Sequence, residues 1–294
     1  MIGFSTFKRL LLATATLGFA AHAAAATAAL TLDVYNPGTA ALFPVSSVLK
    51  KNKKEAILVD AQFGKSQAQQ VVEKIRASGK QLTTIYISHG DPDYYFGLDT
   101  LTAAFPNAKV LASQPTVDHI KATVEGKLKF WGPKMGADVP AKTIIPGVLK
   151  GHSLSLEGQT LDIVGLDGKQ PDRSFVWIPS IKAVVGGVVV AENIHVWMAD
   201  TQSAQSHADW LSTLDHIVKL QPQTLVPGHY LGDSSRSLAA VHFTAEYIKA
   251  FDEETAKAKD STALIAAMHK RYPNLGEESS LELSAKVAKG EMQW

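Results

Sequence analysis

Residues 85–97 read Ile-Tyr-Ile-Ser-His-Gly-Asp-Pro-Asp-Tyr-Tyr-Phe-Gly, and the interpretation of the whole chain starts from this stretch. Three β-favouring residues lead into His89, Asp91 and Asp93. Alternate side chains at the end of an extended strand point to the same side, so these three can converge on one point. An imidazole with two carboxylates suits a divalent ion such as Zn²⁺, Mn²⁺ or Fe²⁺. The alternative is a polar turn after a strand, where Asp and Pro are common.

Two further segments place this stretch in a larger pattern. Asp60 lies in Ala-Ile-Leu-Val-Asp-Ala-Gln-Phe-Gly (residues 56–64), and His229 lies in Val-Pro-Gly-His-Tyr-Leu-Gly (residues 226–232). Together with Ser-His-Gly-Asp-Pro-Asp-Tyr (residues 88–94), they resemble the ordered landmarks of the metallo-β-lactamase superfamily. The resemblance extends from about residue 31 to about residue 270. It implies a four-layer αββα sandwich of two mixed sheets with outer helices, and a site on one edge of the sheets.

The chain departs from the pattern of that family, which is His-x-His-x-Asp-His, then a third His, a bridging Asp and a last His. Asp91 replaces the second His, and Tyr94 replaces the His that follows Asp93. The third-His region, residues 165–174, contains no His, and Lys169 is nearest the expected position. Gly187 stands where the bridging Asp would be. An ordinary two-zinc centre is therefore not expected.

The remaining ligand-type residues predict at most one divalent ion per chain, with Zn²⁺ favoured over Mn²⁺ or Fe²⁺. Four side chains would hold it: His89, Asp91, Asp93 and His229. In this interpretation, Lys169 or Tyr94 faces the substrate oxygen, and Asp93 can act as general base on an activated water. The competing interpretation has no metal. The ammonium of Lys169 would lie between Asp91 and Asp93 and relieve their repulsion, leaving a salt-bridged remnant of a metal site.

His195 is a further candidate site residue. It follows a Gly-rich strand in Ala-Glu-Asn-Ile-His-Val-Trp-Met-Ala-Asp (residues 191–200), where members of the family often place site residues. The ordinary alternative is a histidine whose hydrogen bonds are satisfied within the protein. Fold analogy gives weaker support to Glu192, Trp197 and Asp200.

The N-terminus has the pattern of an export signal. Lys8 and Arg9 precede the apolar run 10–20 and the Ala-rich run 21–29, so residues 1–26 are expected to be a signal peptide and residues 27–294 a single domain. The expected location is the periplasm or the exterior of the cell. Removing Lys8 and Arg9 leaves 27 of the 29 basic residues against 28 acidic ones, a net charge of −1. A nearly neutral chain gives no electrostatic case for binding nucleic acid or a membrane surface. The absence of Cys excludes thiolate ligands and disulfides.

Local patterns predict the following elements. Strands are expected near residues 30–35, 41–49, 55–60, 83–88, 110–112, 153–156, 160–165, 174–178, 183–190 and 224–226, mostly antiparallel in the second half because the connections there are short. Helices are expected over 66–77, opened by a capping box at Ser66, and over 96–104, 115–124 and 206–220, with two or three more at the C-terminus. Gly and Pro residues predict a long loop over 125–140, either a flap near a pocket or a surface loop.

These observations favour an exported hydrolase that acts on an ester, lactone, amide or related small molecule. One alternative is a non-catalytic binding protein with a decayed metal site. A β-lactamase in the narrow sense is a weaker alternative, because such enzymes keep three His at the first zinc. The substrate and the oligomeric state remain open.

Overall fold

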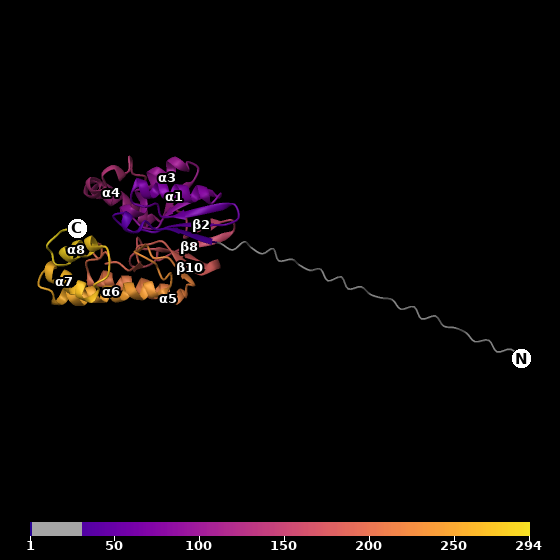
Figure 1. The fold of residues 1–294 in the computed structure, drawn as a ribbon. Coiled ribbons are helices and arrows are strands. Elements are labelled where there is room, and N and C mark those ends of the chain that lie inside the picture. The colour runs from indigo at the N-terminus through magenta and orange to yellow at the C-terminus, as the bar shows by residue number, and fades with distance from the viewer. Residues whose placement is uncertain (2–30) are drawn as a thin grey trace.

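The protein forms four layers, helix, sheet, sheet and helix, in a computed structural model that describes Met1 and residues 31–294 (Figure 1). The predicted signal segment lies outside the described residues, apart from Met1. Helices α1 and α3 lie on the outside of the first sheet, and α5 and α6 lie on the outside of the second. The predicted αββα sandwich of two mixed sheets is confirmed.

The first sheet has six strands in the order β1-β2-β3-β4-β5-β6. Strands β1 to β3 are antiparallel, and β3 to β6 are parallel. The strand bounds are β1 Thr31–Tyr35, β2 Ser47–Lys51, β3 Glu55–Val59, β4 Gln81–Ile87, β5 Lys109–Ala112 and β6 Gly147–Val148.

The second sheet has five strands in the order β12-β10-β9-β8-β7, antiparallel except for the β10/β12 pair. A separate parallel pair, β11 with β13, places Ala191 opposite His229. The strand bounds are β7 Ser153–Leu156, β8 Gln159–Val164, β9 Phe175–Ile178, β10 Ala183–Val185, β11 Ala191–Glu192, β12 Thr224–Leu225 and β13 His229–Tyr230.

The helices fill the two outer layers and the C-terminal region. Their bounds are α1 Lys65–Ala77, α2 Pro92–Tyr95, α3 Leu98–Ala104, α4 Gln114–Met135, α5 Ala204–Leu220, α6 Leu238–Lys257, α7 Ser261–Arg271 and α8 Glu278–Ala288. Three short 3₁₀ turns cover Gly38–Ala40, Gly136–Asp138 and Pro179–Ile181. Within the described residues, no helix is both long and apolar enough to cross a bilayer.

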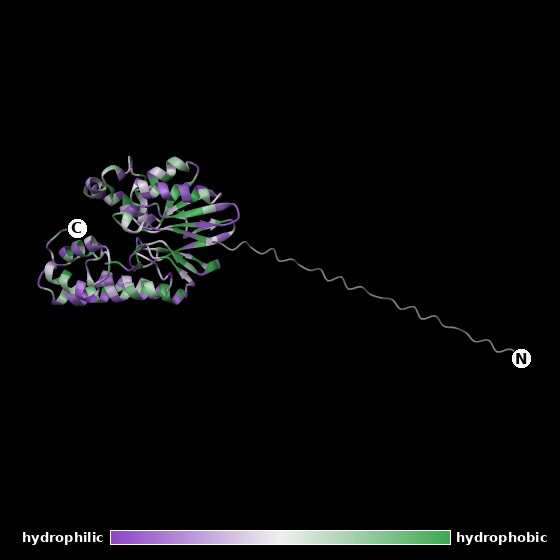
Figure 2. Cartoon of the chain, in the orientation of Figure 1, coloured by the Kyte–Doolittle hydropathy of each residue, from purple (hydrophilic) through white to green (hydrophobic). Residues whose placement is uncertain are grey.

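Apolar side chains from both sheets form the central core, which appears as the green strands in the middle of Figure 2. Val48, Ile57, Val176 and Val185 are fully buried there. Each sheet buries its other face against helices, because a sheet that is apolar on both faces needs cover on both. The loops at one end of the layers are left free to carry polar groups.

Two local predictions around helices α1 and α4 were wrong. The expected loop 125–140 is mostly helix, since α4 continues to Met135 and only a 3₁₀ turn follows it. Packing of the buried Trp131 against Phe43 and Phe63 outweighs the weak helix propensity of Gly126 and Gly132. Helix α1 begins at Lys65 without a side-chain cap, and Ser66 donates its hydroxyl to Asp138 instead of forming a capping box.

Candidate functional site

The motif loop begins where the parallel strands β3 and β4 end side by side. Asp60 follows β3, and its carboxylate accepts hydrogen bonds from the backbone N–H and the hydroxyl of Ser88, which follows β4. Asp60 is fully buried, and this burial raises its pKa to about 7. Through these hydrogen bonds, the predicted landmark Asp60 fixes the start of the motif loop at Ser88.

His89 and Asp91 form the first of two charged clusters. The Nδ1 of His89 donates to the carbonyl of Asp172 at 3.0 Å, and its Nε2 lies 3.0 Å from Asp91 Oδ2. Burial disfavours the imidazolium, but the Asp91 carboxylate outweighs it and raises the pKa of His89. Both ring nitrogens thus face oxygen acceptors, an arrangement that suits the doubly protonated ring.

Lys127 of α4 completes this first cluster. Its ammonium donates to Asp91 Oδ1 and lies 3.3 Å from His119 Nε2. Burial acts against the charge of Asp91, yet Lys127 and His89 together hold the pKa of Asp91 well below its usual range. The carboxylate that replaces the second family His is therefore neutralised by two cations of the protein itself.

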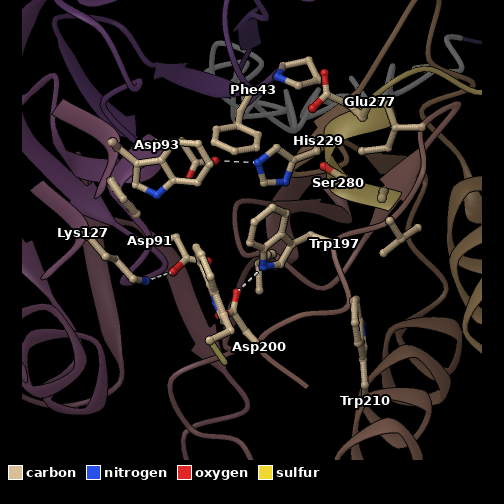
Figure 3. A pocket seen from close by; sticks show the side chains of 18 residues that line it. Phe43, Asp91, Asp93, Lys127, Trp197, Asp200, Trp210, His229, Glu277 and Ser280 are labelled. Carbon is tan, nitrogen blue, oxygen red and sulfur yellow. Dashed lines mark hydrogen bonds and ion pairs between the residues drawn. The ribbon is translucent and has the colours of Figure 1, made fainter. Parts of the chain in front are cut away.

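Asp93 and His229 form the second cluster. His229 Nε2 donates to Asp93 Oδ2 at 2.6 Å, and the hydroxyl of Tyr94 lies 3.3 Å from His229 Nδ1 (Figure 3 shows the Asp93–His229 bond). The ring of Tyr94 meets both His89 and His229 edge-on, with centroids 5.3 and 5.4 Å away. Burial and the nearby carboxylates raise the pKa of Tyr94 well above its usual value, so the phenol stays neutral. Tyr94 therefore separates the two histidines with an uncharged ring.

Backbone packing accounts for the missing bridging carboxylate. Gly187 has a φ of +80°, and a Cβ there would lie 2.4 Å from the carbonyl oxygen of Ser174. A Cβ on Gly228 would lie 2.2 Å from the carbonyl oxygen of Gly187 and 2.8 Å from the Tyr94 hydroxyl. No side chain fits at position 187 without moving this backbone.

The third-His region supplies a buried cation of a different kind. Arg173 is 6% exposed, and its guanidinium lies 4.3 Å from the ring centroid of Trp210. Its Nε and one terminal nitrogen have no hydrogen-bond partner among the described residues. Burial lowers the pKa of Arg173.

The two clusters open into one pocket with about 620 Å³ of empty space, including its mouth (Figure 3). Polar groups and larger apolar side chains both line it. The polar lining is Asp91, Asp93, Lys127, Asp200, His229, Glu277 and Ser280, and the larger apolar lining residues are Phe43, Trp131, Val188, Ile194, Val196, Trp197, Trp210 and Trp294.

Two predicted site residues lie elsewhere. Lys169 is exposed and does not line the pocket, and Lys127 occupies the role of resident cation that the sequence suggested for Lys169. His195 is fully buried behind the pocket wall, where its Nδ1 lies 3.1 Å from the Tyr247 hydroxyl. Burial lowers the pKa of His195 to about 4. Of the weaker candidates, Trp197 and Asp200 line the pocket, whereas Glu192 binds Ser234 and Ser235.

Glu277, which immediately precedes α8, is a pocket residue that sequence reasoning missed. Burial raises its pKa to about 7, with a further contribution from Asp93, and its Oε2 has no hydrogen-bond partner among the described residues. A carboxyl with such a pKa holds a proton near neutral pH and can release it. No local pattern marks this Glu, because it is one of several acidic residues in residues 277–282.

As they stand, the motif side chains do not fit a metal ion. Zinc ligands lie about 2.0–2.2 Å from the ion, so their donor atoms must lie within about 4 Å of one another. Within the described part of the chain, no three of His89, Asp91, Asp93 and His229 bring ligand atoms within 4.8 Å of one another. The donors are instead paired internally, with Lys127 on Asp91 and the Tyr94 ring between the two histidines.

Comparison with known proteins agrees with the fold. The family model described as "Metallo-beta-lactamase superfamily" matches residues 40–229. A metallo-β-lactamase family protein from Thermus thermophilus, TTHA1429, superposes with a TM-score of 0.60 at 17% identity and covers 89% of this chain and 94% of its own. The metallo-β-lactamase DIM-1 gives a TM-score of 0.53 at 17% identity, over 75% of this chain and 97% of its own.

A shorter match joins the chain to an uncharacterised Bacillus subtilis protein, YobT, at 36% identity over 74 residues, which is 25% of this chain and 31% of that protein. The chain thus spans less than a third of that relative's length. The family match covers the three sequence landmarks and ends at His229, the last predicted ligand. This chain belongs to the metallo-β-lactamase superfamily, whose members generally bind divalent metal ions, usually zinc.

Proposed function

We propose that the protein is an exported hydrolase that cleaves a small ester, lactone or amide with an apolar acyl part. The observation that carries this proposal is the pocket, which Lys127, Asp93 and Glu277 line together with several aromatic side chains. An apolar pocket with a few convergent polar groups and shifted pKa values is the usual form of an active site for small molecules.

The chain's own residues can supply the steps of such a hydrolysis. The Lys127 ammonium can stabilise the negative charge that develops on a carbonyl oxygen. Asp93, fixed in orientation by His229, can accept a proton from an attacking water through its second carboxylate oxygen. Glu277, protonated near neutral pH, can return a proton to the leaving group.

The single-ion site predicted from the sequence remains a rival for the same pocket. It would require Asp91 to release Lys127, and His89 and His229 to turn away from their present partners. Loss of a bound ion in His229→Ala, measured together with chelator sensitivity, decides between a metal at the motif and the resident Lys127. The binding-protein alternative predicts a ligand in this pocket without turnover.

The test is hydrolysis of a panel of aryl esters, alkyl esters and lactones by purified, chelator-treated protein. We expect Asp93→Asn to lower kcat/KM by about 10²–10⁴-fold and Lys127→Met by about 10²–10³-fold. The matched control is Lys129→Met, an exposed lysine on the same helix, which should change kcat/KM by less than about twofold.

Two results would contradict the proposal. Failure of the wild type to hydrolyse any substrate, with or without added metal, would favour the binding-protein alternative. Activity that disappears with chelator and returns with one equivalent of Zn²⁺, together with a bound equivalent that is lost in His229→Ala, would favour the metal at the motif residues over Lys127.

A further inference from the structure

Three side chains outside the pocket lie together behind its wall. His195 lies in the segment after β11, His269 in the last turn of α7, and Glu278 is the first residue of α8. Each offers one ligand atom, and these atoms all lie within 4.8 Å of one another. His269 Nε2 already lies 2.8 Å from Glu278 Oε1.

His195 is the least ordinary member of this group. Its side chain is completely buried, and its Nε2 has no hydrogen-bond partner among the described residues. A buried ring nitrogen without a partner costs free energy that a bound ligand would recover. The backbone N–H of His195 donates to the carbonyl of Gly276 at 2.8 Å, which fixes the main chain, and the Tyr247 hydroxyl 3.1 Å from Nδ1 orients the ring.

We propose that His195, His269 and Glu278 bind a divalent transition-metal ion of the Zn²⁺ type, separate from the motif residues. Two imidazoles and one carboxylate form a common donor set for zinc, with water as the fourth ligand. Ca²⁺ and Mg²⁺ are hard cations that prefer oxygen donors at every position. The two histidine nitrogens therefore favour an ion of intermediate hardness such as Zn²⁺.

The geometry needs only small adjustments. Ligand atoms in a tetrahedral zinc site lie about 3.3 Å apart, as follows from Zn–N distances of about 2.0–2.1 Å. The side chains of His269 and Glu278 are 42% and 49% exposed, so they can rotate toward an ion while the buried His195 stays fixed. Their partial exposure also gives the ion a route of entry.

Tyr247 supplies the outer support that metal-binding histidines usually have. Its hydroxyl lies 3.1 Å from His195 Nδ1, where it can accept the Nδ1–H and leave the Nε2 lone pair free for a metal. Such second partners fix the tautomer and orientation of the ring.

The site would join the C-terminal helices to the pocket wall. His195 lies between Ile194 and Val196, which both line the pocket, and α8 contributes Ser280 to it. An ion held by the loop, α7 and α8 would therefore fix one wall of the pocket in position. It would act on stability and on the shape of the pocket.

The experiment is a Zn²⁺ titration of chelator-stripped full-length protein by calorimetry, with thermal unfolding measured in parallel. We expect one saturable equivalent that raises the melting temperature of the wild type. His269→Ala and Glu278→Gln should weaken this binding by about 100-fold or more, and Tyr247→Phe by about 10-fold. His242→Ala, at an exposed histidine on α6, is the matched control and should bind as the wild type does.

A second readout is the visible absorption of bound Co²⁺, whose intensity reports low coordination number and which should fall in His269→Ala. The proposal is overturned if no saturable Zn²⁺ binding occurs, or if His269→Ala and Glu278→Gln bind as tightly as the wild type. It is also overturned if His229→Ala, rather than His269→Ala, removes the bound equivalent, since the ion would then belong to the motif residues.

Discussion

Lys127→Met removes the ammonium that neutralises the carboxylate of Asp91, and we expect it to destabilise the fold markedly. The side chains of Lys127 and Asp91 are 13% and 15% exposed, so the pair is largely screened from water. Breaking one partner of a buried ion pair costs about 3–5 kcal/mol, because the other charge stays buried without compensation. His89 still contacts Asp91 at 3.0 Å, so we expect the lower end, about 3 kcal/mol.

The assay is urea unfolding followed by tryptophan fluorescence, with Lys129→Met as the control. In a parallel thermal unfolding experiment, a loss of about 3 kcal/mol should lower the melting temperature of a domain of this size by about 6–12 °C. Lys127→Met combined with Asp91→Asn should recover much of the loss, since the second change removes the uncompensated charge.

The pH dependence of this loss follows from the lowered pKa of Asp91. A depressed carboxyl pKa gives stability that is present above the unfolded value, 3.8, and is lost as pH falls through the folded value. The difference between wild type and Lys127→Met should therefore be largest near neutral pH and shrink below about pH 4. A loss under about 0.5 kcal/mol at pH 7, equal to that of Lys129→Met, would refute the role of Lys127 as the compensating cation.

Three further predictions concern the pocket, the metal and export. The pKa of Glu277 is raised to about 7 in the folded protein, so its protonated form stabilises the fold fully below about pH 4.5, and this stabilisation is lost as pH rises through 7. The free energy of unfolding of the wild type should therefore fall between pH 5 and pH 8. In Glu277→Gln this fall should be smaller by about 1–2 kcal/mol. Elemental analysis of dialysed His269→Ala should find less than one equivalent of metal, whereas a full equivalent lost on His229→Ala would support an ion at the motif. Expression in a Gram-negative host should give a periplasmic protein shortened by about 23–26 residues, and an intact Met1 in the cytoplasm would contradict the signal peptide.

The sequence was sufficient for the fold because its landmarks lie where strands end. The runs before Asp60, His89 and His229 are apolar and short, so they predict buried strands whose ends bring polar residues to one edge. The strand predicted over residues 183–190 was too long, since β10 ends at Val185. The Gly186–Gly187 backbone adopts positive φ there and turns away from the sheet, for reasons of close packing that no local pattern reveals.

Lys127 could not be identified from the sequence as the cation beside Asp91, because the helix α4 that carries it was predicted to end at residue 124. Gly126, Gly132 and Pro133 suggested a loop, which hid the fact that His119 and Lys127 are separated by eight residues on one helix and therefore share a face. The helix persists because Trp131 is buried among aromatic rings far away in sequence. Pro133 lies inside the helix and lacks the N–H that would bond to the carbonyl of Lys129, so the packing of Trp131 also offsets this loss.

The misassigned helix also concealed a cation that competes with a metal for Asp91. Four ligand-type residues at motif positions are a strong signal for an ion when no competing cation is visible nearby. The competing cation comes from α4 and the separating ring from Tyr94, and both act through tertiary contacts across the pocket. A change at the motif alone would therefore not restore a two-metal centre. Tyr94→His would return an imidazole, but Gly187 would still have no room for a bridging carboxylate, and Lys127 would still hold Asp91.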